Sequence, residues 1–99
     1  MTIMKRQDRS ELTLFLEGRL DTTTSPQLDA ELAASLGGVT LLTLDMAKLA
    51  YLSSAGLRVI LGAQKRMNKQ GRMVVRHVNE TIMEVFEVTG FVDILTIES

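Results

Sequence analysis

Two adjacent serines, Ser53 and Ser54, are the residues of this sequence that most clearly could carry chemistry. They lie where an apolar, strand-like segment gives way to an amphipathic helical pattern. A hydroxyl at a helix start can accept a hydrogen bond from a free backbone N–H group. A phosphate attached there would meet the same groups and the positive end of the helix dipole. The pair therefore predicts a charge switch at the start of a helix.

Composition argues against several other chemistries. The chain has no cysteine and a single histidine, His77, so disulfides, thiolate zinc sites and thiol catalysis are excluded. A hydrolase using Ser53 or Ser54 as nucleophile would have only His77 as its general base, and no nucleophile-elbow glycine pattern precedes the serines. We expect a binding protein with no catalytic residue, no metal site and no cofactor.

The net charge and the hydropathy of the chain indicate which partners and which cellular location to expect. A net charge of −1 argues against nucleic acid, whose binding depends on Lys and Arg neutralising phosphates. The N-terminal residues lack the apolar core of a signal peptide, and no apolar run approaches the ~20 residues of a membrane span. With 99 residues the chain fits one domain, residues 1–99. We expect a cytoplasmic module without membrane insertion.

Strand and helix patterns alternate along the chain and must position the serines. Two N-terminal strands form a hairpin, residues 18–21 break the pattern, and residues 22–25 supply cap hydroxyls before the first helix, with Pro26 just inside its start. The predicted strands are 3–6, 12–17, 39–44, 73–78 and 94–97, and the predicted helices run from about Pro26 to Leu36 and from about Ser54 to Gln70. Asn79 can cap a third helix, which ends before Gly90.

This order predicts an α/β sandwich with a mixed, four- to five-stranded sheet. The N-terminal hairpin supplies the antiparallel pair, and right-handed crossovers place helices after the central strands. The strand at 39–44 is apolar or β-branched at every position, which predicts helices covering part of each of its faces. Asp45 is expected to end it.

Three features, taken together, resemble a known family. They are Gly18-Arg19-Leu20-Asp21 after the second strand, the central strand before Asp45, and Leu52-Ser53-Ser54-Ala55-Gly56-Leu57-Arg58 at the start of the second helix. The combination resembles the STAS domain, and within it the anti-sigma factor antagonists, also called anti-anti-sigma factors. The similarity runs over nearly the whole chain, including Thr89-Gly90-Phe91 after the third helix.

The resemblance implies a partner-switching protein and no enzyme. A serine kinase of the ATPase-kinase fold, which is the anti-sigma factor or a relative of it, would phosphorylate the domain, and a PP2C-type phosphatase would reverse this. The acceptor of the family matches Ser54. An aspartate commonly precedes the acceptor in the family, whereas this chain has Ser53, so a second candidate hydroxyl is present and a negative charge is missing. We favour Ser54 over Ser53.

The residues around the acceptor are the expected contacts for the partner, each with a simpler alternative. Asp21 could meet a basic group or could cap a helix, Gly56 could admit a partner or could allow helix packing, and Leu57 could anchor the interface or belong to the core. Arg58 could pair with a phosphate on Ser54 or with an acidic partner, or could be an ordinary solvated residue. The expected partner-binding set is Asp21, Thr22, Tyr51, Ser53, Ala55, Gly56, Leu57 and Arg58.

A second function stays open at this stage. Some small STAS proteins are subunits that sit on the cytoplasmic ATPase of an ABC-type lipid transporter, and in that case no phosphorylation is needed. A phosphoserine at position 54 in the native protein distinguishes the two.

Overall fold

The computed structural model describes residues 1–98 as five strands and three α-helices. The N-terminal hairpin pairs β1 (Thr2–Asp8) with β2 (Glu11–Leu20) in antiparallel register, from Thr2 opposite Glu17 to Asp8 opposite Glu11. Arg9 makes the turn with a φ of 57°. Leu12, Leu14 and Leu16 point to one face and are buried, as the alternation in the sequence predicts.

A repeating strand and helix order follows the hairpin. α1 (Ser25–Ser35) leads to β3 (Leu41–Leu52), α2 (Ser54–Gln70) leads to β4 (Arg72–Arg76), and α3 (Glu80–Thr89) leads through a short 3-10 helix (Phe91–Asp93) to β5 (Ile97–Glu98). The Asn79 side chain caps α3 by accepting a hydrogen bond from the Ile82 N–H, and Gly90 ends it in the left-handed conformation. The predicted bounds of α2 and the capping role of Asn79 are confirmed.

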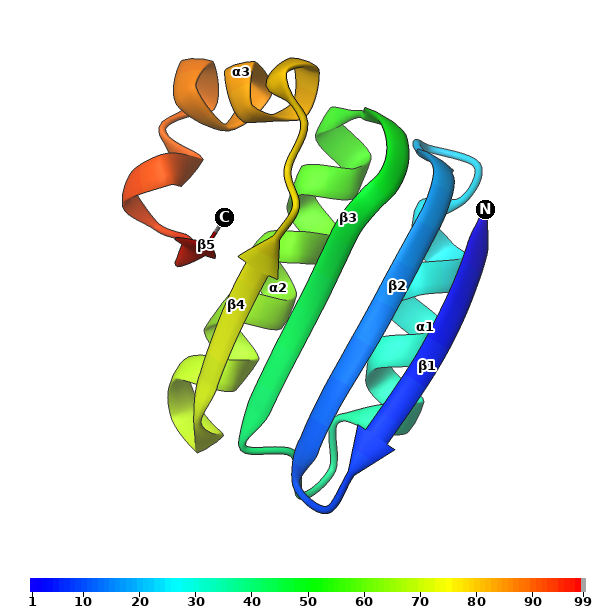
Figure 1. Ribbon diagram of the computed structural model, residues 1–99, viewed down its shortest axis with the longest axis vertical. Coiled ribbons are helices and arrows are strands. Elements are labelled where there is room, and N and C mark those ends of the chain that lie inside the picture. The colour runs from blue at the N-terminus through cyan, green and yellow to red at the C-terminus, as the bar shows by residue number, and fades with distance from the viewer. Residues whose placement is uncertain (99) are drawn as a thin grey trace.

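The five strands form one mixed sheet in the order β1-β2-β3-β4-β5, in which only β1 and β2 are antiparallel. Figure 1 shows α1 and α2 behind the sheet and α3 at its upper end. Since every new parallel strand adds on the same side of the last, successive right-handed crossovers put their helices on one face. The core fills the space between that face and the helices, and includes Leu14, Leu44, Ile60 and Phe86. The predicted fold class is confirmed.

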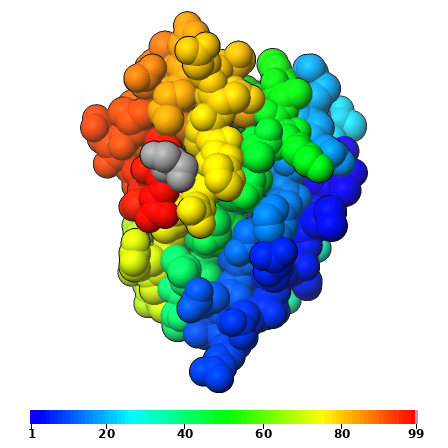
Figure 2. All heavy atoms as spheres, in the orientation of Figure 1, coloured from blue at the N-terminus to red at the C-terminus, as the bar shows by residue number. Residues whose placement is uncertain are grey.

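The expectation that helices cover part of each face of β3 is wrong. Buried and half-buried residues alternate from Leu41 to Met46, because only one face lies against helices. Figure 2 views the other face, where side chains of β1 to β4 lie at the surface.

Several predicted boundaries also need correction. Residues 18–20 continue β2 instead of breaking it, because Gly18, with a φ of 103°, and two register irregularities let the strand keep pairing with β3. Asp45 ends the pairing of β3 with β4, but β3 itself runs on beside β2 to Leu52.

Smaller corrections concern the ends of other elements. Val78 lies beyond β4, and the last strand is shorter than predicted. Helical spacing places Leu61 of α2 and Val85 of α3 among the inward residues, but both are only half-buried. None of the helices in residues 1–98 is both long and apolar enough to cross a membrane.

Candidate functional site

The two serines lie where β2 and β3 end together and α1 and α2 begin. Leu20 and Leu52, the last residues of the two strands, are register partners. The Ser53 N–H then donates to the Leu20 carbonyl over 2.9 Å, which ties the start of α2 to the end of β2. This edge of the sheet brings the loop after β2 close to the serines, as the parallel arrangement predicts.

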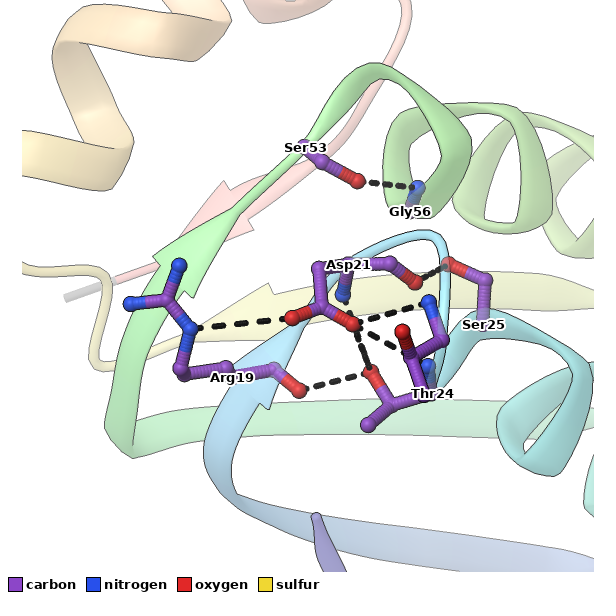
Figure 3. A network of polar contacts seen from close by, with 7 residues as sticks. Arg19, Asp21, Thr24, Ser25, Ser53 and Gly56 are labelled. Atoms are coloured by element: carbon purple, nitrogen blue, oxygen red, sulfur yellow. Dashed lines mark hydrogen bonds and ion pairs between the residues drawn. The ribbon is translucent and has the colours of Figure 1, made fainter.

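Ser53 is the N-cap residue of α2. Its backbone is extended, with φ −97° and ψ 173°, and its hydroxyl accepts a hydrogen bond from the Gly56 N–H over 3.3 Å (Figure 3). A capping oxygen satisfies one of the free N–H groups of the first helical turn. The Ser53 hydroxyl is therefore engaged in holding the helix start.

Ser54 occupies the first helical position and is exposed. Its hydroxyl has no hydrogen-bond partner within residues 1–98. The two neighbouring hydroxyls thus differ in their surroundings, since one is half-buried and engaged and the other faces solvent.

Asp21 organises the loop between β2 and α1. Its Oδ1 atom accepts hydrogen bonds from the Thr23 and Thr24 N–H groups over 3.0 and 3.1 Å, and the Arg19 Nε lies 3.6 Å from Oδ2 (Figure 3). These contacts, the Thr24 N–H first among them, hold the pKa of the Asp21 carboxyl below its usual value. Asp21 therefore holds the loop and does not cap the helix, because the start of α1 has no side-chain cap; the interpretation of Asp21 as a helix cap is wrong.

The hydroxyls of this loop brace it from inside. Thr24 accepts a hydrogen bond from the Asp21 N–H over 2.9 Å and donates to the Arg19 carbonyl over 2.7 Å. Ser25 donates to the Asp21 carbonyl over 2.6 Å. Thr24 is the N-cap residue of α1 but makes no side-chain cap, so the predicted capping role of its hydroxyl is wrong. The exposed neighbour Thr22 lines the groove described below.

Arg19 and Tyr51 stack at the same edge and add a contact that the sequence interpretation missed. They are register partners on β2 and β3, and the Arg19 guanidinium lies 4.1 Å from the centre of the Tyr51 ring. Tyr51 is 40% exposed. The segment containing Arg19 is recognisable in the sequence, but the pairing with Tyr51 depends on the register of the two strands.

Gly56 and Leu57 face inward, which corrects their expected role in partner binding. A Cβ atom at Gly56 would lie 2.7 Å from side-chain atoms of both Leu20 and Leu52, and Leu57 is buried in the core. The packing interpretation of Gly56 is therefore the one that the structure supports. Neither residue offers a surface to another protein.

A groove of about 420 Å³ opens beside the serines, between the start of α1 and the first half of α2. Arg58 is exposed at its edge, one helical turn after Ser54, and has no carboxylate within 4.0 Å in the part of the chain that the structure describes. The groove is lined by Thr22, Ser25, Pro26, Asp29, Ala55, Arg58, Val59 and Gly62.

His77 belongs to a different part of the molecule. Its Nδ1 atom lies 2.9 Å from the Asp45 carboxylate, and both residues line a groove on the face of the sheet that no helix covers. The structure therefore engages the only histidine away from the two serines. Residues 1–98 contain no cluster of three or more potential metal ligands from His, Cys, Asp and Glu.

A mixed five-stranded sheet with helices on one face and a capped helix start at the end of its central strand defines the STAS class of fold. A family model described as "Mlab, STAS domain" matches residues 3–96. The chain belongs to the STAS domain family.

Relatives and solved structures agree with this assignment. The chain is 39% identical over 88 residues, covering 87% of it and 76% of the relative, to BtrV of Bordetella bronchiseptica, whose name describes an anti-sigma factor antagonist. It is 28% identical over 98 residues to the anti-sigma-B factor antagonist of Listeria monocytogenes, covering 97% and 86% of the two chains.

Among solved structures, the fold is similar to an anti-sigma factor antagonist from Mycobacterium paratuberculosis, with a TM-score of 0.88, 18% identity and coverage of 97% and 83% of the two chains. It is also similar to the antagonist SpoIIAA in its unphosphorylated form, with a TM-score of 0.78, 20% identity and coverage of 99% and 88%. At these identities the structures support the fold alone.

Proposed function

We propose that this protein is an anti-sigma factor antagonist that acts in the cytoplasm as a partner switch. Unphosphorylated, it binds an anti-sigma factor, a serine kinase of the ATPase-kinase fold. Phosphorylation of Ser54 releases it, and a PP2C-type phosphatase restores binding. The observation that carries the proposal is the contrast between the two hydroxyls, because Ser53 caps α2 while Ser54 is exposed at its first turn.

Phosphorylation at Ser54 is compatible with an intact fold. A phosphoserine carries about −1.5 to −2 charges at neutral pH. A negative group at an exposed helix N-terminus is favourable by about 0.3–1 kcal/mol. Ser54 is exposed, so the added group displaces no core residue. The modification is therefore expected to leave the free protein folded.

The same group weakens a complex that packs over Ser54. A hydrated dianion forced into an interface carries a desolvation cost and repels nearby acidic groups. Every ~1.4 kcal/mol lost weakens binding tenfold, so a loss of a few kcal/mol is enough for release. The names of the relatives support this role, since BtrV and the Listeria protein are both described as antagonists of anti-sigma factors.

The serine at position 53 fits the same scheme. Ser and Asp are both good N-cap residues, because each offers an oxygen to the N–H groups of the first turn. Ser53 therefore keeps the capping contact that an aspartate would make but brings no charge beside the acceptor. We infer that Ser53 assists the site as a cap and that Ser54 is the phosphorylated residue.

Binding measurements with the cognate anti-sigma factor, combined with phosphopeptide mass spectrometry, test the proposal. We expect phosphate on Ser54, loss of phosphorylation with retained binding in Ser54→Ala, and loss of binding in Ser54→Asp. Thr96→Asp adds the same charge at an exposed distant residue and should bind like the wild type.

Two results would contradict the proposal. The first is phosphate found on Ser53 in place of Ser54, and the second is binding of Ser54→Asp with wild-type affinity. A native protein that never carries phosphoserine, with full function in Ser54→Ala, would favour the transport-subunit alternative.

A further inference from the structure

The helix that begins at Ser54 carries an unbalanced charge. α2 contains Arg58, Lys65, Arg66 and Lys69 and no acidic residue, although the whole chain has a net charge of −1. All four side chains are exposed, and none has a carboxylate within 4.0 Å inside residues 1–98. α1 and α3 carry acidic residues and no basic ones. α2 is thus a basic stripe without a balancing partner in its own chain.

A furrow runs along this stripe between α1 and α2. The groove beside Ser54 shares Asp29 and Gly62 with a second hollow of about 110 Å³ further along the helices. We call the combined feature the α1–α2 furrow and define it by Ser25, Asp29 and Ala33 on α1 and Arg58, Gly62 and Arg66 on α2. Two arginines of the stripe therefore stand along the furrow.

Gly62 lies in the furrow, and no packing contact within residues 1–98 requires a glycine there. Glycine in the middle of an exposed helix destabilises it relative to alanine. At Gly56 that cost is explained, because a Cβ would collide with Leu20 and Leu52, whereas a Cβ at Gly62 would meet no atom within 4 Å. The bare backbone at this point leaves room for another molecule to approach closely.

We propose that the α1–α2 furrow receives an acidic segment of the anti-sigma factor, whose carboxylates pair with Arg58 and Arg66 while its backbone passes over Gly62. This inference rests on the proposed function and extends the contact from the acceptor along α2. Charge complementarity favours an acidic segment, since none of the four cations of α2 forms an ion pair within residues 1–98 and the two arginines outnumber Asp29 in the furrow.

The furrow also gives the switch a mechanism. Ser54 and Arg58 are four residues apart, and side chains at this spacing meet on one face of a helix. A phosphate on Ser54 pairs with the Arg58 guanidinium. The phosphate then competes with the partner's carboxylate for the same arginine. The partner is released because it loses this ion pair as well as because the phosphate repels it.

Nucleic acids and anionic membranes also bind basic surfaces, but they fit this one less well. Polyanion binding depends on many cations that neutralise phosphates. Here four cations lie beside an α1 that carries only acidic charges, and Asp29 lines the furrow itself. A folded segment with few carboxylates matches this mixed surface better than a uniform polyanion.

Affinity and stability, measured together on point variants, test the inference with the cognate anti-sigma factor. Gly62→Gln is expected to raise the midpoint of thermal unfolding of the free chain and to weaken binding at least tenfold. Arg66→Glu is expected to weaken binding at least tenfold with unfolding unchanged. Lys48→Glu makes the same charge change in the groove on the opposite face of the sheet and should stay within twofold of wild type.

A second measurement needs only the chain itself. Titration with a short helical peptide that carries two glutamates should shift the amide signals of Arg58, Gly62 and Arg66, and added salt should reverse the shifts. Vesicles of anionic lipid and a short DNA duplex serve as comparison probes. Binding of either probe at the furrow with higher affinity than the peptide would overturn the inference.

The failures of the two proposals are distinguishable. If Ser54→Asp loses the anti-sigma factor while Gly62→Gln and Arg66→Glu bind it like the wild type, the furrow inference is wrong and the switch stands. If the wild type binds no anti-sigma factor but the peptide shifts map to the furrow, the proposed function fails and the acidic-ligand site stands. Peptide shifts spread evenly over the surface would contradict the furrow.

Discussion

The starts of α1 and α2 lie at the same edge of the sheet but are built in different ways. α1 is entered through a loop in which Asp21, Thr24 and Ser25 make five hydrogen bonds of 3.1 Å or less with backbone groups of the same loop. α2 is entered directly from β3, with one side-chain cap from Ser53 and a glycine pressed against the sheet.

The two helix starts differ in which of their polar side chains make hydrogen bonds within the chain. In the loop before α1, the side chains of Asp21, Thr24 and Ser25 are engaged with nearby backbone groups and hold the loop in place. The start of α2 uses one hydroxyl for its cap and leaves the next one at the surface. A helix start held by packing and by a single cap keeps its geometry while a neighbouring side chain stays available for chemistry.

Gly56→Val disrupts the packing at the start of α2 and should give the largest loss of stability. A side chain there overlaps Leu20 and Leu52, and overpacking of a core costs about 1–3 kcal/mol. For a domain of this size each kcal/mol lowers the melting temperature by about 4–8 °C. Thermal unfolding followed by circular dichroism measures the change. Gly62→Ala on the same helix is the matched control and should not lower the melting temperature; equal losses in both variants would contradict the packing role of Gly56.

Variants of Ser53 and Ser54 compare how much each hydroxyl contributes to the stability of the fold. Loss of an N-cap oxygen costs about 1 kcal/mol, so Ser53→Ala should be less stable by that amount. Ser53→Asp keeps a capping oxygen and should retain nearly all of the stability. Ser54→Ala removes an exposed side chain and should change the free energy of unfolding by less than about 0.5 kcal/mol. Urea unfolding of the three variants provides the numbers, and a larger loss in Ser54→Ala than in Ser53→Ala would reverse the assignment of the cap.

The pH dependence of stability tests the contacts of Asp21 in the loop before α1, and this is the smallest effect that we expect. The pKa of Asp21 is lowered in the folded protein, chiefly by the Thr24 N–H. The unfolded chain therefore takes up the proton first as the pH falls, and the stabilisation present above the usual pKa is lost as the pH drops through the folded pKa. In Asp21→Asn the melting temperature should fall less steeply between about pH 5 and pH 2 than in the wild type.

Asp29→Asn provides the control for this measurement. Asp29 is an exposed carboxylate of α1, and its side chain makes no hydrogen bond within residues 1–98. The Asp29→Asn profile therefore measures the effect of removing one carboxylate that makes no contact in the loop. A profile for Asp21→Asn that is as steep as the wild-type profile would show that the loop contacts do not depend on the charge of Asp21.

Much of the secondary structure is predictable from local signals. The serine before α2, Gly71 after it, Asn79 before α3 and Gly90 after it mark helix ends because their side chains or backbone freedom satisfy the unpaired groups there. The hairpin follows from the alternation of leucines in β2. The pairing of distant strands is harder to predict from the sequence. β2 and β3 each continue past the residue that the local pattern marks as their end, because the two strands pair with each other through an irregular register.

The candidate site divides in the same way. The sequence indicated Ser53, Ser54 and Asp21, since hydroxyls and a carboxylate beside helix starts have a recognisable pattern. It could not separate the inward Gly56 and Leu57 from the outward Arg58, nor find the stacking of Arg19 on Tyr51. Those distinctions depend on which side of α2 rests on the sheet and on the strand register.

By itself, then, the order of residues determined most of the elements, the family and the place of the candidate acceptor, because caps, alternation and helical spacing act over a few neighbouring positions. Only the tertiary structure decided that α1 and α2 share one face of the sheet, that one of two adjacent hydroxyls is engaged, and that Gly62 opens onto a furrow between two helices. The physical reason is that burial and hydrogen-bond partners are set by segments distant in sequence, which meet only once the sheet is assembled.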